Sequence, residues 1–159
     1  MIYAFVQRLL RDQSGIGFVE LALVAPLLAL MFLGMIDMSK VIATRVDLEQ
    51  AAQRTTDLAL GKRPPNGNTA YLVSEAVAAS GVPSSDVTVT LTCECDGVVQ
   101  NKFTNMCSSG QVTRRFATVS IKKQVSTGFN WRIVGAMFTG GSATYTPITV
   151  IGDSVVRLQ

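Results

Sequence analysis

The first third of the chain carries two successive hydrophobic patterns. Residues 16–36 are almost uninterruptedly apolar, and Glu20 is their only charged residue before the pattern changes. At about 1.5 Å of rise per residue, a helix of this length spans about 31 Å, which matches the hydrocarbon thickness of a bilayer. The pattern therefore predicts a helix that crosses a membrane once.

A helical pattern continues beyond the apolar run. Over residues 39–60 apolar residues recur at helical spacing. Gly61 and the two prolines after it should end this helix, because glycine favours a C-terminal cap and proline cannot continue a helix. A shorter helix is predicted over residues 69–80. The residues expected to face inward are Val41, Ile42, Val46, Leu48, Ala52 and Ala59 in the first of these helical segments and Leu72, Val73, Ala76 and Val77 in the second.

After Asp86 the apolar residues repeat with a period of two, which is typical of strands. Further strands are predicted over about residues 112–125 and 143–158. Three antiparallel strands on the outer half of the long helix would bury a face that none of them buries alone. The predicted fold class is therefore α+β. One face of the first strand carries Val87, Val89, Leu91, Cys93 and Cys95, and in the second strand Ala117, Val119, Ile121 and Lys123 alternate with Phe116, Thr118, Ser120 and Lys122.

Composition and charge narrow the classes of function. The chain has 159 residues and a formal net charge of +3, so one modest domain follows the apolar run. The basic pairs Arg114-Arg115 and Lys122-Lys123 point to opposite faces of a strand and form no groove-sized patch, so no nucleic acid is expected as a partner. The chain contains no histidine, which excludes the familiar catalytic triads, and it has no phosphate-binding glycine motif. We therefore expect neither an enzyme nor a bound cofactor.

Glu20 is the unusual residue of the apolar run. A carboxylate one turn inside a membrane span costs about 2.5 kcal/mol or more unless it reaches the interface or finds a partner. Pro26 lies in the same run, where its missing N–H should kink or loosen the helix unless neighbouring groups satisfy the freed carbonyl. Both residues favour a helix that packs against a partner in the membrane.

The sequence around Glu20 resembles the class III signal of type IV prepilins, in which a short basic leader and a glycine precede an apolar helix with glutamate at its fifth position. The wider sequence, Arg-Asp-Gln-Ser-Gly at residues 11–15 and Val-Glu-Leu-Ala-Leu-Val-Ala-Pro-Leu-Leu at residues 19–28, resembles the TadE-like family of tight-adherence pseudopilins. The acidic Asp37 just after the span also fits this family. Leu21 departs from the aromatic residue that the family often has after the glutamate.

The resemblance implies a pilin-like α+β fold in four segments. These are a leader peptide at residues 1–15, a transmembrane helix at 16–36, a periplasmic helical extension at 37–60 and a small α+β periplasmic domain with an antiparallel sheet at 61–159. It also implies a single pass through the inner membrane with a cytoplasmic N-terminus, which agrees with the arginines in the leading segment.

The resemblance further implies processing and assembly. A prepilin peptidase would cut between Gly15 and Ile16, which leaves Glu20 as the fifth residue. Its carboxylate would then meet the freed N-terminal amine of a neighbouring subunit, because a buried charge pair is better than two unpaired charges in lipid.

The implied function is that of a minor pilin of a type IVc (tight-adherence) pilus, in its initiation, its assembly or surface adhesion. The implied partners are the prepilin peptidase, the major pilin, other minor pilins and the inner-membrane assembly platform, and the subunit could enter an extracellular pilus. One alternative is an uncleaved single-pass protein whose periplasmic domain is a binding or scaffold module of an envelope complex. Another is an ordinary signal peptide that ends at Val41-Ile42-Ala43.

The three cysteines lie in the part assigned to an oxidising compartment, where disulfides form. Cys93 and Cys95 are two residues apart on one strand face, which makes a bridge between them strained, so Cys107 is the shared partner. We favour Cys95 with Cys107, which would add about 2–3 kcal/mol by the loop-entropy model; Cys93 with Cys107 is the alternative. The third thiol is expected to be buried rather than to cross-link subunits. A zinc site is not expected, because a fourth ligand is missing.

The segment after the second strand is rich in aromatic residues. Phe129, Trp131, Phe138 and Tyr145 occur within a short stretch of the sequence. We expect them to pack in the core, and the alternative is a surface-exposed contact site.

Overall fold

The computed structural model describes residues 16–142 and 144–159, and the predicted leader with the cleavage residue Gly15 lies outside the described residues. The chain divides into two compact units, Met1–Met38 and Ser39–Gln159. Helix α2, Ile16–Gly61, contributes residues to both units. Its end at Gly61 confirms the predicted helix over residues 39–60 to within one residue. Pro26 lies inside α2 and does not end it.

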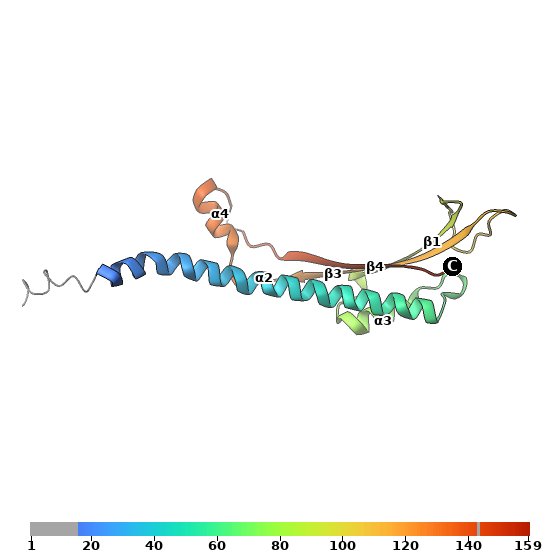
Figure 1. Ribbon diagram of the computed structural model, residues 1–159, viewed down its shortest axis with the longest axis horizontal. Helices are drawn as coiled ribbons and strands as arrows, with labels where there is room; N and C mark the ends of the chain where they lie inside the picture. Colours follow the sequence, from blue (N-terminus) through green and yellow to red (C-terminus); the bar gives the residue numbers. More distant parts are fainter. Residues whose placement is uncertain (1–15, 143) are drawn as a thin grey trace, which may run out of the picture. The chain divides into compact units, whose positions relative to one another are not determined.

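The second unit contains a four-stranded antiparallel sheet in the order β2-β1-β3-β4 (Figure 1). The short 3₁₀ turns Pro65–Gly67 and Ser84–Asp86 flank helix α3, Ala70–Ser80. Helix α4, Trp131–Thr139, joins β3 to β4. The strands are β1 (Val87–Cys95), β2 (Val98–Val99), β3 (Thr113–Val125) and β4 (Ile148–Arg157). This arrangement confirms the predicted α+β class.

The core lies between the second half of α2, helix α3 and one face of the sheet. Side chains at helical spacing on α2 meet side chains at alternate positions of the strands, as the two periodicities require. One buried cluster centres on Leu48, Ala51 and Ala52, and a second contains Ala59. The other buried residues of the first cluster are Ala76, Val82, Val87, Val119, Ile121 and Val150; those of the second are Leu72, Ala117 and Leu158.

Strand β4 runs along α2 in the same direction. Buried Gly152 lies over Leu48, the hydroxyls of Thr56 and Ser154 are 2.9 Å apart, and Leu158 shares a cluster with Ala59. An ion pair of 2.8 Å between exposed Arg54 and partly buried Glu75 links α2 to α3. It contributes little stability because water screens the Arg54 side of the pair.

The predicted inner face of α2 is wrong at two positions. Ile42 and Val46 are exposed, whereas Leu48, Ala52 and Ala59 are buried as predicted. At about 100° per residue, Ile42 and Val46 lie about 120° and 160° around the helix from Leu48, so they cannot reach the same face. The buried face is completed by small residues that the prediction omitted, namely Ala51, Thr55 and Thr56.

The last predicted strand and the aromatic segment also need correction. β4 begins at Ile148 instead of residue 143, because its ladder with β3 starts at the Val125–Ile148 pair and β3 extends no further. Helix α4 was not predicted. Its sequence signals were Asn130, whose side chain caps the helix by accepting from the amide of Arg132, and Gly140, which ends it in the left-handed conformation.

The short strand β2 was missed as well. Asp96 and Gly97 have φ angles of 50° and 85°, and they form the two-residue turn that joins β1 to β2. An Asp-Gly pair after a strand is a strong hairpin signal, because both residues tolerate positive φ.

Candidate assembly helix and disulfide loop

The first half of α2 presents apolar side chains that none of the described residues of its own unit covers. Phe18 and Leu23 are each 77% exposed. The helix is long and apolar enough to cross a membrane, judged by length and composition. A surface of this kind is stable in lipid or against other apolar helices, and not in water. The other large exposed side chains of this half are Val19, Leu21, Val24, Leu27, Leu28, Met31, Phe32, Leu33, Met35 and Ile36.

Glu20 stands in the second turn of α2 as an exposed carboxylate among these apolar residues. Glu20 is the fifth residue of α2, which begins at Ile16. Gly15, on the other side of the predicted cleavage bond, is not among the described residues. A carboxylate at this position can form an ion pair with a cation brought by a neighbouring helix.

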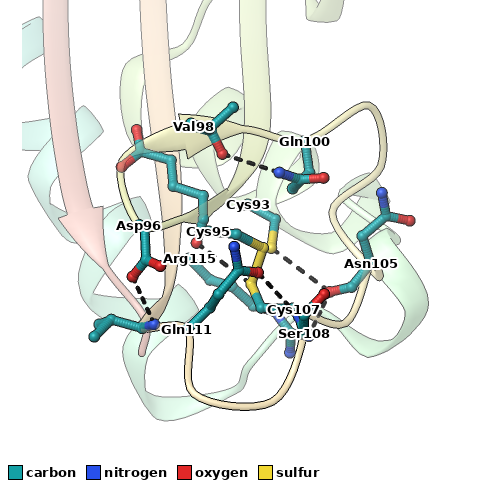
Figure 2. Close-up of a disulfide and its surroundings, with 12 residues drawn as sticks. Cys93, Cys95, Asp96, Val98, Gln100, Asn105, Cys107, Ser108, Gln111 and Arg115 are labelled. Carbon is teal, nitrogen blue, oxygen red and sulfur yellow. Dashed lines mark hydrogen bonds between the residues drawn. A yellow bond between two sulfur atoms is a disulfide. The ribbon is translucent and has the colours of Figure 1, made fainter.

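A disulfide joins Cys95 at the end of β1 to Cys107 in the following loop (Figure 2). This is the first of the two pairings that the sequence left open. Cys93 keeps a free, buried thiol. Its sulfur lies 3.6 Å from the carbonyl oxygen of Asn105, which also accepts a hydrogen bond of 3.4 Å from the guanidinium of Arg115.

The disulfide loop is tied down at both ends. The carboxylate of Asp96 accepts a 2.9 Å hydrogen bond from the amide of Val112, and the side chain of Gln111 accepts one of 3.0 Å from the amide of Ser108 (Figure 2). The guanidinium of Arg115 lies 5.5 Å from the ring centre of Phe103, a cation–π distance. These contacts hold the loop at the end of the sheet where β1 ends and β3 begins.

The three sulfur atoms of Cys93, Cys95 and Cys107 lie within 4.8 Å of one another. Such a cluster has the spacing of metal ligands, but a sulfur in a disulfide is not a thiolate and cannot bind zinc as one. While the Cys95–Cys107 bond is formed, this cluster therefore offers one thiol and no metal site.

The second unit also has a cavity of about 350 Å³ between α2, the end of α3 and the end of β3. Its charged residues are Asp47, Arg54 and Lys123, all exposed side chains. The remaining lining residues are Thr44, Leu48, Gln50, Ala51, Ala79 and Ser80.

The aromatic segment around α4 is not a core element throughout, contrary to the prediction. Phe138 is 86% exposed and Tyr145 is 40% exposed, whereas Phe129 and Trp131 are partly buried. Phe129 and Trp131 make an edge-to-face contact with ring centres 5.0 Å apart. Of the two exposed residues, Phe138 lies in α4, Trp131–Thr139, and Tyr145 lies between α4 and β4.

Among known proteins, the similarity that this chain shows is confined to α2 and the residue before it. The chain matches no curated protein and no solved structure. A family model described as TadE-like protein matches residues 15–57, which include Glu20 and most of α2. The predicted resemblance to the TadE-like family is thereby confirmed over residues 15–57.

Proposed function

We propose that the protein is a minor pilin of a tight-adherence pilus, held in the inner membrane by the first half of α2 until it is assembled. The observation that carries the proposal is the uncovered apolar half of α2 with its single carboxylate, Glu20. The family match over residues 15–57 supports an association with such a pilus.

The proposed mechanism has two steps. A prepilin peptidase cuts between Gly15 and Ile16, which creates a positively charged amine at Ile16. The helices of neighbouring subunits then pack side by side in lipid, and Glu20 of one subunit pairs with the amine of the next. Neither charge is tolerated alone in hydrocarbon, so the pair selects the register in which the helices are aligned.

The second half of α2 connects the apolar half to the folded domain. It is buried against the sheet through Leu48, Ala52 and Ala59, so a pull on the apolar half is transmitted to the folded domain through one continuous helix. The proposed role is structural rather than enzymatic. The proposed partners are the peptidase, the major pilin, other minor pilins and the assembly platform of the inner membrane. The domain is proposed to lie in the periplasm.

The decisive test is the N-terminal sequence and intact mass of the membrane-extracted protein, from cells with and without an active prepilin peptidase. We expect a start at Ile16 that depends on the peptidase. A variant with Gly15→Leu should stay uncut, since a bulky residue replaces the glycine before the bond, and Gly17→Ala, at a described position with open space around it, is the control.

A start at Met1 in both strains would contradict the processing step. The protein would then be an uncleaved single-pass protein whose domain serves as a binding or scaffold module of an envelope complex. A start after Ala43 would instead identify an ordinary signal peptide and remove the membrane anchor altogether.

A further inference from the structure

Helix α4 has an apolar face that is exposed at three of its four positions, and the fourth, Val134, is partly buried. Ile133, Val134, Met137 and Phe138 lie within about 140° of one another around the helix, and Arg132 and Thr139 lie on the opposite side. Met137 and Phe138 are 78% and 86% exposed, and Ile133 is exposed as well. An isolated apolar residue on a surface is ordinary, but adjacent ones on one helix face mark a contact surface.

The position of α4 in the domain can be derived from the β4–α2 contact. Gly152 lies over Leu48, and β4 runs in the direction of α2. Ile148, the first residue of β4, is four residues earlier, about 13 Å along the strand. The same distance along a helix corresponds to about nine residues, which leads from Leu48 back to Ser39.

Ser39 is where the domain begins, three residues after the end of the apolar run at residues 16–36. The connection from β3 to β4, which contains α4, therefore lies at the end of the domain where the chain leaves the apolar run. The disulfide loop lies at the other end, since Cys95 pairs with Thr113 at the start of β3.

Charge favours a particular partner for this face. Between Asp96 and Asp153 the sequence has no aspartate or glutamate, but it has six basic residues. Arg132 is the one charged residue of the connection that contains α4, and Lys122 and Lys123 near the end of β3 are exposed. A segment without carboxylates is not repelled by the phosphates of anionic lipids, and its cations are attracted to them.

We propose that α4 is an interfacial helix that docks, through Ile133, Met137 and Phe138, on the anionic phospholipid surface of the membrane that α2 crosses. Its apolar face enters the boundary between headgroups and acyl chains, and Arg132 stays in the headgroup layer. Trp131 in α4 and Tyr145 in the connection to β4 have the amphipathic side chains that favour the headgroup level. The domain is thereby held against the membrane by a second contact besides α2. Docking requires only that the apolar half of α2 lies in a bilayer, and it is independent of cleavage and of fibre assembly.

Trp131 provides a direct reporter, because it is the only tryptophan of the chain. The full-length protein is reconstituted at low density into vesicles of phosphatidylcholine and phosphatidylglycerol whose acyl chains carry bromine, which quenches tryptophan at the acyl boundary. We expect strong quenching of Trp131 by the brominated lipid and weak quenching by aqueous iodide. Loss of one large apolar side chain shifts a docking equilibrium by about tenfold. Met137→Ser with Phe138→Ser should therefore reduce lipid quenching at least about twofold and increase iodide quenching.

Met106→Ser is the matched control. Met106 is 93% exposed and lies in the disulfide loop at the other end of the sheet. Its substitution should leave both kinds of quenching unchanged. Because Met137 and Phe138 contribute little to the core, far-UV circular dichroism should be the same for all variants. Equal lipid quenching in wild type and in the double variant would overturn the docking. Lipid quenching that appears only when protein is crowded in the vesicle would also overturn it, because the occupant of the face would then be a second copy. Either result would leave the proposed assembly role of Glu20 unaffected.

Discussion

Gly152 of β4 lies in direct contact with the backbone of α2 at Leu48. A Cβ atom placed on Gly152 would lie 2.5 Å from the carbonyl carbon of Leu48 and 2.6 Å from its Cβ. Nonbonded carbon atoms do not approach so closely, so the missing side chain is what allows the sheet to rest on the helix here. The contact fixes the position of β4 along α2.

Gly152→Ala should therefore destabilise the domain. The added methyl group meets backbone atoms that cannot rotate away, so strand and helix must separate locally. Overpacking of this kind costs about 1–3 kcal/mol, and contact with backbone favours the upper end. The free energy of unfolding of the full chain, measured by denaturant titration in a fixed detergent, should fall by this amount.

Gly135→Ala is the control for that substitution. Gly135 lies in α4 with no atom within 4 Å of an added Cβ, and alanine favours a helix by up to about 1 kcal/mol over glycine. The variant should be as stable as the wild type or more so. If both variants behaved alike, the close approach at Leu48 would not be a determinant of stability.

The helices and strands with a clear period could be predicted from the sequence, and the contacts between them could not. The alternation from Val87 to Cys95 predicts β1 to the residue, since one buried face imposes a period of two. Gly152 gives no such pattern. A glycine in a strand suggests a bulge or a close approach, but only the packed fold identifies Leu48 as the neighbour.

Short elements were missed for a different reason. Helix α4 depends on its caps, Asn130 and Gly140, more than on a long periodic run, and a prediction that starts from periodicity passes over it. The same holds for β2, whose two residues follow the Asp96-Gly97 turn. The sequence alone identifies Glu20 as the unusual residue of the apolar helix. It does not decide between the two disulfide pairings, because that depends on how the loop brings Cys107 back to β1.

Two substitutions that each break the disulfide should lower the stability of the domain by different amounts, because Cys93 lies close to both bonded cysteines. The Cys95–Cys107 bond spans 12 residues, and its loss should cost about 2–3 kcal/mol. Cys107→Ser should show this full loss, because Cys93 and Cys95 do not bridge easily on one strand face. Cys95→Ser should lose less, because the sulfurs of Cys93 and Cys107 are close enough to form a replacement bond on oxidation.

Alkylation of the unreduced, denatured proteins followed by mass spectrometry checks this directly. Wild type should take up one label, on Cys93, Cys95→Ser should take up none, and Cys107→Ser should take up two. Cys93→Ala should take up none and keep most of its stability. Two labels on Cys95→Ser would show that Cys93 cannot reach Cys107.

Tyr71 predicts a loss of stability in alkaline solution. Burial raises the pKa of the Tyr71 phenol above its ordinary value of 10.0, and its hydroxyl donates a hydrogen bond to the carbonyl of Lys62. The folded state therefore holds this proton to a higher pH than the unfolded state does. The resulting stability is fully present below about pH 10 and is lost as the pH rises through the raised pKa of the folded state.

Tyr71→Phe should reduce the fall in unfolding free energy between about pH 9 and pH 11. Comparison of the two slopes removes the contributions of the lysines, which both proteins share. A Tyr71→Phe slope equal to that of the wild type would assign the alkaline loss to other groups.

Glu20 should control incorporation into the fibre without controlling entry into the membrane. The apolar half of α2 is long enough to insert with or without one carboxylate, whereas breaking a buried charge pair leaves an unpaired charge and costs about 3–5 kcal/mol. Glu20→Ala and Glu20→Gln should therefore be found in the membrane fraction at normal levels and be depleted from sheared pili by about tenfold or more. Glu20→Gln separates the charge from the shape of the side chain, and Asp47→Asn, which removes one exposed negative charge from the same helix, should assemble normally. Assembly of Glu20→Gln at the wild-type level would show that the charge has no role in packing, and the helix register would then have to be set by the apolar side chains alone.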